Sequence, residues 1–200
     1  MKKIPLDIVL LPSDEIVDLC IELSRRAYER GENKFLRNKV DRLPHATLLM
    51  GCSRDTEIQN VLDAVGEIAQ KTMPLTLTIT KQYAMEDFGG LEIQNTDDLT
   101  ALHEEIVQKV YPLLHQDCEI SDLVEDAGYA LGPESRIYTN TFVPEWSGKK
   151  FWPHITTHNR KEEDIALPVT FVARTLAVCP MGDRGTCRKP LATFTMRNVS

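Results

Sequence analysis

The sequence predicts an α+β fold of two lobes, with antiparallel sheets, helices on their outer faces and a central cleft. Strand-like and helix-like segments follow in the order β, α, β, α, β, β, α, and three more strands come after an irregular stretch. Residues 74–84, PLTLTITKQYA, alternate leucine or isoleucine with threonine, which is typical of a half-buried antiparallel strand. A Pro-His-x-Thr stretch stands in each half of the chain, at 44–47 and at 153–156. Two lobes that face each other would bring these stretches to one cleft.

The first two strand and helix units are predicted from the spacing of their apolar residues. Residues 4–11 form an apolar run that indicates a buried strand, and a stripe of helical spacing then continues until Gly31. A second strand over 45–50 is followed by a helix over 55–71, in which apolar residues recur every three or four positions. The chain therefore opens as strand, helix, strand, helix.

The middle of the chain is regular at first and then becomes harder to assign. The glycine pair within 87–94 indicates a turn that would close a hairpin with the preceding strand. A third helix begins near Asp97 and is interrupted by Pro112. Residues from about 117 to 150 mix a short acidic helix, Gly-Pro turns and one strand-like piece. We interpret this stretch as an insertion of irregular structure.

The end of the chain is predicted to form a hairpin. Segments 167–180 and 188–196 are rich in β-branched and apolar residues, and they flank a turn at 182–185 that begins and ends with glycine. We treat residues 1–200 as a single domain of two pseudo-symmetric lobes, to which the insertion is added.

Composition and charge narrow the classes of function. Of the 200 residues, 42% are hydrophobic and 26% are charged, which is ordinary for a globular protein and excludes a disordered or fibrous one. The 30 acidic residues outnumber the 23 basic ones, and the formal net charge of −7 would repel a long polyanion. If the substrate is a nucleic acid, we therefore expect a nucleotide or a short RNA end and no long duplex.

The sequence shows no leader pattern and no membrane span. The N-terminus lacks a charged stretch followed by an apolar run and a small-residue cleavage site, and no apolar run approaches the ~18 residues that cross a bilayer. The five cysteines are scattered and odd in number, which argues against a disulfide framework. We expect a monomeric protein of the reducing cytoplasm, without a membrane partner.

The two Pro-His-x-Thr stretches suit acid–base chemistry on a phosphodiester. Side chains at positions i and i+2 of a strand share a face, so His45 lies with Thr47, and His154 lies with Thr156. Two imidazoles can give and take protons near neutral pH, while two hydroxyls can hydrogen-bond the non-bridging oxygens. The plainer alternative is a chance repeat of a short motif around two structural histidines. The shared proline and the position of both motifs at the start of strands favour the catalytic interpretation.

Two aromatic residues are candidates for binding the substrate. Trp152 lies two residues before His154 and could stack on a nucleobase, a contact that contributes about 1–3 kcal/mol. Tyr83, beside the predicted hairpin, could act in the same way. Both side chains could equally belong to the core.

A metal site is a further alternative for the second motif. In HITTH, residues 154–158, the two histidines would share one face of a helix, with Cys179 or Cys187 as further ligands. The preceding proline and the three β-branched residues between the histidines favour a strand instead.

Paired His-x-Thr motifs about a hundred residues apart, in a chain of 200 residues with this order of elements, resemble the 2H phosphoesterase superfamily. Its members include the RNA 2′,3′-cyclic phosphodiesterases historically called 2′-5′ RNA ligases. By this resemblance, the catalytic residues are His45, Thr47, His154 and Thr156. The second motif departs from the family pattern in one respect, because Thr157 follows it where an apolar residue is usual.

The resemblance also implies a reaction. One neutral imidazole takes a proton from water as the water attacks phosphorus, and the other, as imidazolium, protonates the departing ribose oxygen, without a cofactor or a metal. We favour His45 as the acid and His154 as the base, although nothing in the sequence fixes that order. The implied activity is a metal-independent phosphodiesterase for a 2′,3′-cyclic phosphate or a 2′-5′ linkage of RNA ends or nucleotides. The alternatives are a phosphodiesterase for cyclic dinucleotides or other signalling nucleotides, and a non-catalytic nucleotide-binding module.

Overall fold

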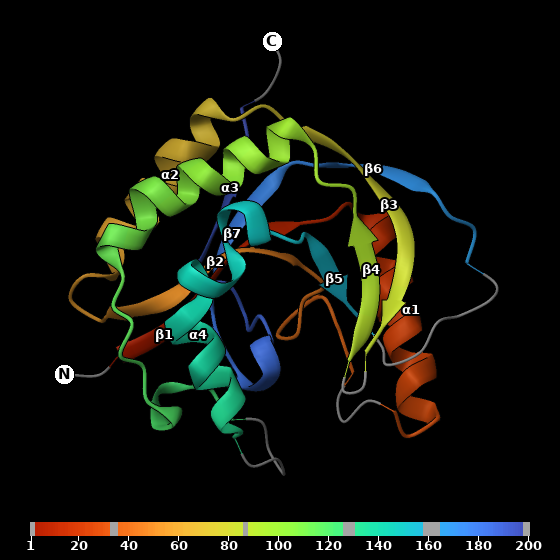
Figure 1. Ribbon diagram of the computed structural model, residues 1–200, viewed down its shortest axis with the longest axis horizontal. Helices are drawn as coiled ribbons and strands as arrows, with labels where there is room; N and C mark the ends of the chain where they lie inside the picture. The colour runs from red at the N-terminus through yellow and green to blue at the C-terminus, as the bar shows by residue number, and fades with distance from the viewer. Residues whose placement is uncertain (1–2, 33–35, 86–87, 126–130, 158–164, 198–200) are drawn as a thin grey trace.

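The computed structural model describes residues 3–32, 36–85, 88–125, 131–157 and 165–197 of the chain. Within them, the strands form two four-stranded sheets with helices around them (Figure 1). Every strand pair in both sheets is antiparallel. This arrangement confirms the predicted α+β class with antiparallel sheets.

The two sheets draw their strands from separate parts of the chain. The first sheet has the order β2-β1-β7-β8, and the second has the order β5-β4-β3-β6. The strands of the first sheet are β1 (Lys3–Leu11), β2 (Ala46–Arg54), β7 (Thr175–Pro180) and β8 (Ala192–Thr195). Those of the second are β3 (Leu75–Ala84), β4 (Gly89–Ile93), β5 (His154–Thr156) and β6 (Val169–Ala173). The first His-x-Thr motif therefore belongs to the first sheet, and the second motif to the second.

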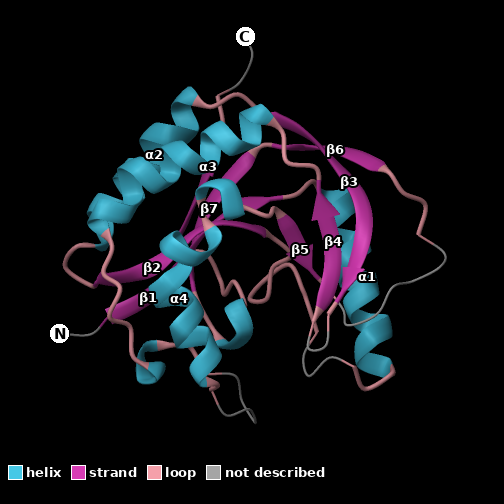
Figure 2. Ribbon diagram, viewed as in Figure 1, coloured by secondary structure: helices cyan, strands magenta, loops and turns pink. Residues whose placement is uncertain are grey.

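The long helices divide between the two sheets. They are α1 (Asp14–Glu29), α2 (Ile58–Lys71), α3 (Asp97–Val110) and α4 (Pro133–Trp146). Helices α2 and α3 contact each other and the first sheet, whereas α1 lies along the second sheet (Figure 2). Short 3-10 turns occur at Tyr111–Leu113, Ile120–Asp122, Gly148–Lys150 and Asp183–Gly185. No helix in the described part of the chain has the length and apolarity that a membrane span requires.

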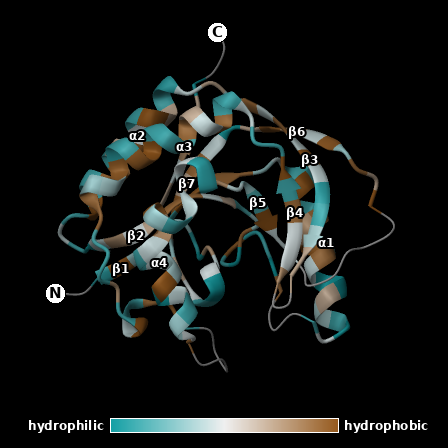
Figure 3. Ribbon diagram, viewed as in Figure 1, coloured by the Kyte–Doolittle hydropathy of each residue, from teal (hydrophilic) through white to brown (hydrophobic). Residues whose placement is uncertain are grey.

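Burial follows the predicted periodicities. Strand β1 is buried from Pro5 to Leu10, because it lies between β2 and β7. In β3, Leu75 and Leu77 are buried while Thr76 between them is exposed, which confirms the predicted half-buried strand. Hydrophobic and hydrophilic residues are interspersed along α2 and α3 (Figure 3), as expected for helices that bury one face.

The predicted irregular insertion is wrong for residues 133–146, which form helix α4 and pack against β2. The buried residues of this helix are Ser135, Thr139 and Phe142, so most of its inner face is polar. Ser135 Oγ donates to Asp183 Oδ1 at 2.8 Å, and Thr139 Oγ1 donates to the Ser135 carbonyl at 2.7 Å. A helix that is held by hydroxyl hydrogen bonds has no apolar stripe for sequence reading to detect.

The C-terminal segment 167–180 was predicted as one strand of a hairpin, and the structure divides it. Residues up to Ala173 form β6, which pairs with β3, and residues from Thr175 form β7, which pairs with β1 and β8. Hence the β7–β8 hairpin is confirmed, but the chain passes from one sheet to the other at Arg174. A single exposed residue, Arg174, separates the two strands, and one charged residue within a strand-like run is too short a break to predict a change of sheet.

Four of the five cysteines are paired, so the expectation of no disulfide framework was wrong. Cys52 pairs with Cys118 at a Cα–Cα distance of 5.9 Å, and Cys179 pairs with Cys187 at 5.5 Å. Cys20 is buried and free. Spacing along the chain does not predict the first pair, because Cys52 and Cys118 are 66 positions apart in sequence.

Candidate active site

Both motifs lie on strands at the edge of a sheet. Strand β2 ends the order of the first sheet and β5 ends the order of the second, and these two edge strands contact each other. His45 immediately precedes β2, and His154 begins β5. The fold therefore brings together two sequence segments about a hundred residues apart, as the sequence predicted.

Each motif histidine is held by the same backbone hydrogen bond. His45 Nδ1 lies 2.7 Å from the carbonyl oxygen of Leu43, and His154 Nδ1 lies 2.8 Å from that of Trp152. A carbonyl can only accept, so Nδ1 carries the hydrogen in both rings. In the neutral form, Nε2 is then the nitrogen with the free lone pair. Each ring is thus prepared to exchange a proton through Nε2.

The carbonyls that hold the rings are themselves on anchored segments. Leu43 N–H donates to the carbonyl of Cys187 at 3.1 Å, and the carbonyl of Pro153 accepts from Ile93 N–H of β4 at 3.0 Å. The proline between each carbonyl and its histidine has a restricted φ, which further limits the position of the ring. This is a physical role for the Pro-His pair that both motifs share.

A buried carboxyl group joins the histidine and the threonine of the first motif. Asp7, on β1, is 0% exposed, and its Oδ2 lies 3.2 Å from His45 Nε2. Thr47 Oγ1 donates to the same Oδ2 at 3.1 Å. His45 and Thr47 therefore point to one place, as the i and i+2 spacing predicted. A register shift between Ile8 and Val9 in the β1–β2 ladder lies next to this contact.

Sequence reasoning missed Asp7. The signal was present, because Asp7 is the one charged residue within the apolar run IPLDIVLL. A charged side chain in a buried strand requires partners and is a candidate functional group. The apolar pattern of the run predicts a strand, but it does not show which partners the interrupting carboxyl group contacts.

Opposing influences act on the ionisation of Asp7. Burial raises the pKa of its carboxyl group. Three neighbours act to lower this pKa: His45 through a hydrogen bond and its charge, Thr47 through a hydrogen bond, and Arg37 through its charge. Burial prevails. Arg37, in the loop before β2, is 5% exposed, and burial lowers the pKa of its guanidinium group to about 10. A cation and a carboxyl group are thus enclosed together beside the first motif.

Aromatic rings surround the histidine of the second motif. The rings of Trp152 and His154 are stacked with centroids 4.4 Å apart, and the ring of Tyr83 meets His154 edge-on at 5.4 Å. Tyr83 Oη lies 3.4 Å from Thr156 Oγ1. Trp152 Nε1 donates to Glu92 Oε2 at 2.7 Å. The structure therefore places both predicted substrate-binding residues, Trp152 and Tyr83, beside the second motif.

The environment of His154 favours its neutral form. Burial lowers the pKa of His154, and the positive charge of His45 lowers it further. The hydrogen bond with the Trp152 carbonyl and the charge of Glu92 act in the opposite direction but do not prevail. A neutral imidazole with a free Nε2 is the form that a general base requires.

Close packing against β4 sets the position of the second motif. Gly90 pairs with Thr156, and a Cβ atom at Gly90 would overlap the carbonyl oxygen of Ile155. Thr157, which departs from the family pattern, is 2% exposed, and its N–H donates to the carbonyl of Gly89 at 2.9 Å. Thr157 therefore occupies a buried position despite its hydroxyl.

Among the residues that it describes, the structure does not support the metal site considered from the sequence. His154 starts a strand, and His158 lies outside the described residues. Cys179 and Cys187 are bonded to each other. Across the described ranges, no group of three or more His, Cys, Asp or Glu side chains is arranged to hold a metal ion.

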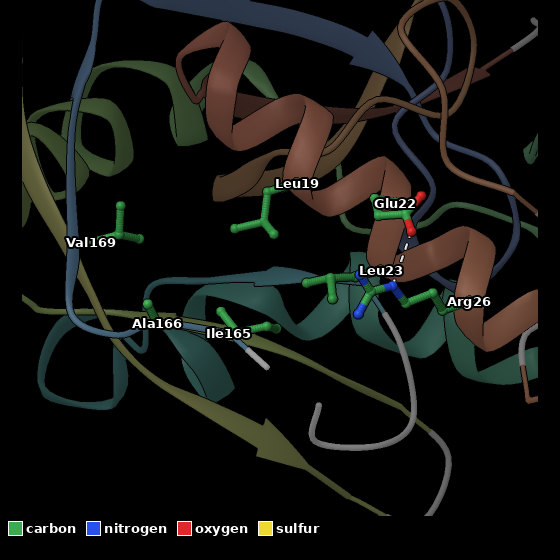
Figure 4. Close-up of a pocket in the computed structure, with 7 residues that line it drawn as sticks. All are labelled: Leu19, Glu22, Leu23, Arg26, Ile165, Ala166 and Val169. Carbon is green, nitrogen blue, oxygen red and sulfur yellow. Dashed lines mark hydrogen bonds and ion pairs between the residues drawn. The ribbon is translucent and has the colours of Figure 1, made fainter. Parts of the chain in front are cut away.

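A cavity of about 190 Å³ lies between α1 and the segment that leads into β6 (Figure 4). Its lining combines aliphatic side chains with the hydrogen-bonded pair Glu22 and Arg26, and it includes no residue of either motif. The cavity is therefore separate from the candidate active site.

Solved structures share this fold over nearly the whole chain. Apo LigT from E. coli, a 2H phosphoesterase, matches with a TM-score of 0.57 at 12% identity, over 99% of this chain and 100% of LigT. The protein TT0787 from Thermus thermophilus matches with a TM-score of 0.60 at 12% identity, over 98% of this chain and 100% of TT0787. A protein described as a phosphoesterase matches at 0.53 and 14% identity, over 98% of this chain and 100% of its own.

No protein-family model and no curated protein matches the sequence. LigT has also been crystallised with 3′-AMP and with ATP. In fold, the structural matches agree with the resemblance to the 2H phosphoesterases, and the chain has a LigT-like fold.

Proposed function

We propose that the protein is a metal-independent phosphodiesterase that acts on a 2′,3′-cyclic phosphate or a 2′-5′ phosphodiester of RNA ends or nucleotides. The observation that carries this proposal is the shared geometry of the two motifs, in which each Nδ1 is bonded to the carbonyl two residues earlier. Two imidazoles fixed in this way on facing edge strands supply the acid and the base that phosphodiester hydrolysis needs. The LigT-like fold supports the same proposal.

His154 is the base in this proposal and His45 is the acid. His154 Nε2 takes a proton from water while the water oxygen forms a bond to phosphorus. The bond from phosphorus to a ribose oxygen breaks, and His45 Nε2–H protonates that oxygen to give a hydroxyl group. The lowered pKa of His154 supports its assignment as the base, and the carboxyl group beside His45 supports that residue as the proton carrier.

The remaining site residues bind and orient the substrate. The hydroxyl groups of Thr47 and Thr156 hydrogen-bond the non-bridging phosphoryl oxygens and stabilise the charge that develops there. Thr47 Oγ1 donates to Asp7 Oδ2 at 3.1 Å, so binding a phosphoryl group requires that this hydrogen bond be exchanged. Trp152 and Tyr83 form an aromatic surface beside His154 on which a nucleobase can pack.

The test is turnover of 2′,3′-cyclic nucleotide monophosphates with EDTA present, from about pH 5 to about pH 9, where histidine acid–base pairs titrate. Protein that lacks both motif histidines, purified in the same way, controls for contaminating nuclease. We expect a bell-shaped dependence of kcat/KM on pH that EDTA does not change. Activity that disappears with EDTA and returns with an added divalent cation would contradict the metal-independent reaction.

A signalling nucleotide is the second candidate substrate, because the net charge of −7 disfavours long RNA. A panel that contains cyclic dinucleotides and 2′-5′ dinucleotides next to the cyclic mononucleotides separates the two. Binding of nucleotides without turnover of any substrate in the panel would instead support a binding module.

A further inference from the structure

We propose that Asp7 is a positioning residue that makes His45 the acid of the site, because its carboxyl group and the His45 imidazole share one proton between Oδ2 and Nε2. The inference deepens the proposed phosphodiesterase function and rests on it. It explains why two motifs of the same residue types can perform opposite steps.

The contacts of Asp7 are those of a functional pair. Its Oδ2 lies 3.2 Å from His45 Nε2, the nitrogen that exchanges protons, and accepts from Thr47 Oγ1 at 3.1 Å. Its other oxygen, Oδ1, is buried and has no hydrogen-bond partner among the described residues. A carboxyl group placed only for stability would be expected to have both oxygens satisfied, since a buried unsatisfied oxygen is costly.

The charged and titratable groups around Asp7 come from three further elements. His45 and Thr47 face it from the start of β2, and Arg37 acts on it from the preceding loop. Tyr138 of α4 is close enough for the charge of Asp7 to act on its phenol. On β7, the residue paired with Asp7 is Cys179, which is disulfide-bonded and does not titrate. The cation of Arg37 therefore favours the carboxylate, whereas burial favours the protonated acid.

The second motif lacks an equivalent group. Within the described part of the chain, no carboxylate is within ion-pair distance of His154. The nearest acidic residue on the paired strand, Glu92, is engaged with Trp152 Nε1 at 2.7 Å and with Lys81 Nζ at 3.1 Å. His154 is thus left in a buried position that disfavours its charge, while His45 is beside a group that can balance its charge.

The proton balance of the pair is simple. Before reaction, the pair holds one proton, either as imidazolium and carboxylate or as neutral imidazole and carboxylic acid, and the pair titrates as one unit. During reaction, the Nε2–H proton moves to the departing ribose oxygen, which leaves a neutral imidazole beside a carboxylate. The pair then regains a proton from solvent. At high pH the pair has lost this proton and the acid step stops. Because the negative charge of Asp7 favours the protonated pair, it extends to higher pH the range over which the acid is available.

The experiment is to measure the pH dependence of kcat/KM for a 2′,3′-cyclic nucleotide with wild type, Asp7→Asn and Asp183→Asn. Asn keeps the shape of Asp but cannot carry the charge. Asp183 is a matched control, because it is also a buried aspartate, but its Oδ1 accepts from Ser135 Oγ and Gly132 N–H. We expect the basic limb to move to lower pH by about one to three units in Asp7→Asn. The acid limb should move little, and Asp183→Asn should follow wild type.

Histidine nitrogen NMR across the same pH range gives a readout that does not need turnover. The imidazolium of His45 should lose its proton at lower pH in Asp7→Asn than in wild type. In wild type, the NMR signal of the Asp7 carboxyl carbon should titrate in the same pH range as that of His45. This measurement uses only the wild-type protein, so it can be made even if Asp7→Asn does not fold. An unchanged basic limb and an unchanged His45 titration in folded Asp7→Asn, or independent titration of Asp7 and His45, would overturn the proposal. If wild type turns over no cyclic nucleotide, the phosphodiesterase proposal fails, while the NMR titration still decides whether the pair shares a proton.

Discussion

The two His-x-Thr motifs have the same residue types and the same backbone hydrogen bond, but their surroundings differ. His45 is next to the buried carboxyl group of Asp7, whereas His154 is enclosed by Trp152 and Tyr83. The backbone bond at Nδ1 selects the same tautomer in both rings. The neighbours beyond the motif then set which charge state each ring prefers. A repeated motif can therefore supply two chemically distinct groups, and the difference lies in residues outside it.

The largest expected effect comes from removing either ring. His45→Ala and His154→Ala should each lower kcat by about 10²- to 10⁴-fold, because each removes one of the two proton transfers. Steady-state turnover of a cyclic nucleotide measures the loss. His115→Ala is the control, since His115 is half-buried and bonded to Glu57 away from both motifs, and it should retain activity. If one motif histidine can be removed with little loss, the two rings do not act as an acid–base pair.

Trp152→Leu tests whether the aromatic ring beside His154 binds the substrate or only holds the histidine in place. If Trp152 stacks on the substrate base, KM should rise about tenfold or more with a smaller change in kcat. If Trp152 serves only to hold His154, kcat should fall and KM should stay near the wild-type value. Trp146→Leu, at a half-exposed position on α4, controls for loss of an indole from the protein.

Gly90→Ala tests how firmly the second motif is positioned. The added Cβ would overlap the backbone of Ile155, so β4 and β5 must separate. Overpacking of this kind costs about 1–3 kcal/mol of stability, and the displaced His154 should lower kcat as well. Thermal unfolding together with turnover measures both effects. Gly66→Ala on α2, whose Cβ would have the side chain of Phe194 as its nearest neighbour, should be milder in both measurements.

The smallest effect expected is a shift in the titration of His154. Because burial and the charge of His45 both lower its pKa, the base stays neutral to lower pH than an ordinary histidine with a pKa near 6.5. The acid limb of kcat/KM should therefore have its midpoint below about 6.5. In His45→Gln, where the neighbouring positive charge is gone, the pKa of His154 should rise, as NMR titration can measure. A pKa of His154 that does not respond would mean that the two rings are not electrostatically coupled.

Sequence reasoning succeeded where the pattern is local. Apolar periodicity correctly predicted several elements. These are the strand over 4–11, the helices before Gly31 and Pro112 and the alternating strand over 74–84. It failed for α4, because the buried face of that helix is mostly serine and threonine. It also failed at Arg174, where two strands that belong to different sheets follow each other with only this one exposed residue between them.

Residue spacing along the chain suffices to predict the two imidazole and hydroxyl pairs, because side-chain direction in a strand depends only on neighbouring residues. It also suffices for the α+β class. Long-range packing decided the rest: which edge strands meet, which cysteines pair and which residues surround each ring. Asp7 reaches His45 across a strand pair, and Tyr83 reaches His154 across the second sheet. Such contacts join residues far apart in sequence, so they depend on the assembled core, and they are what distinguishes the two motifs chemically.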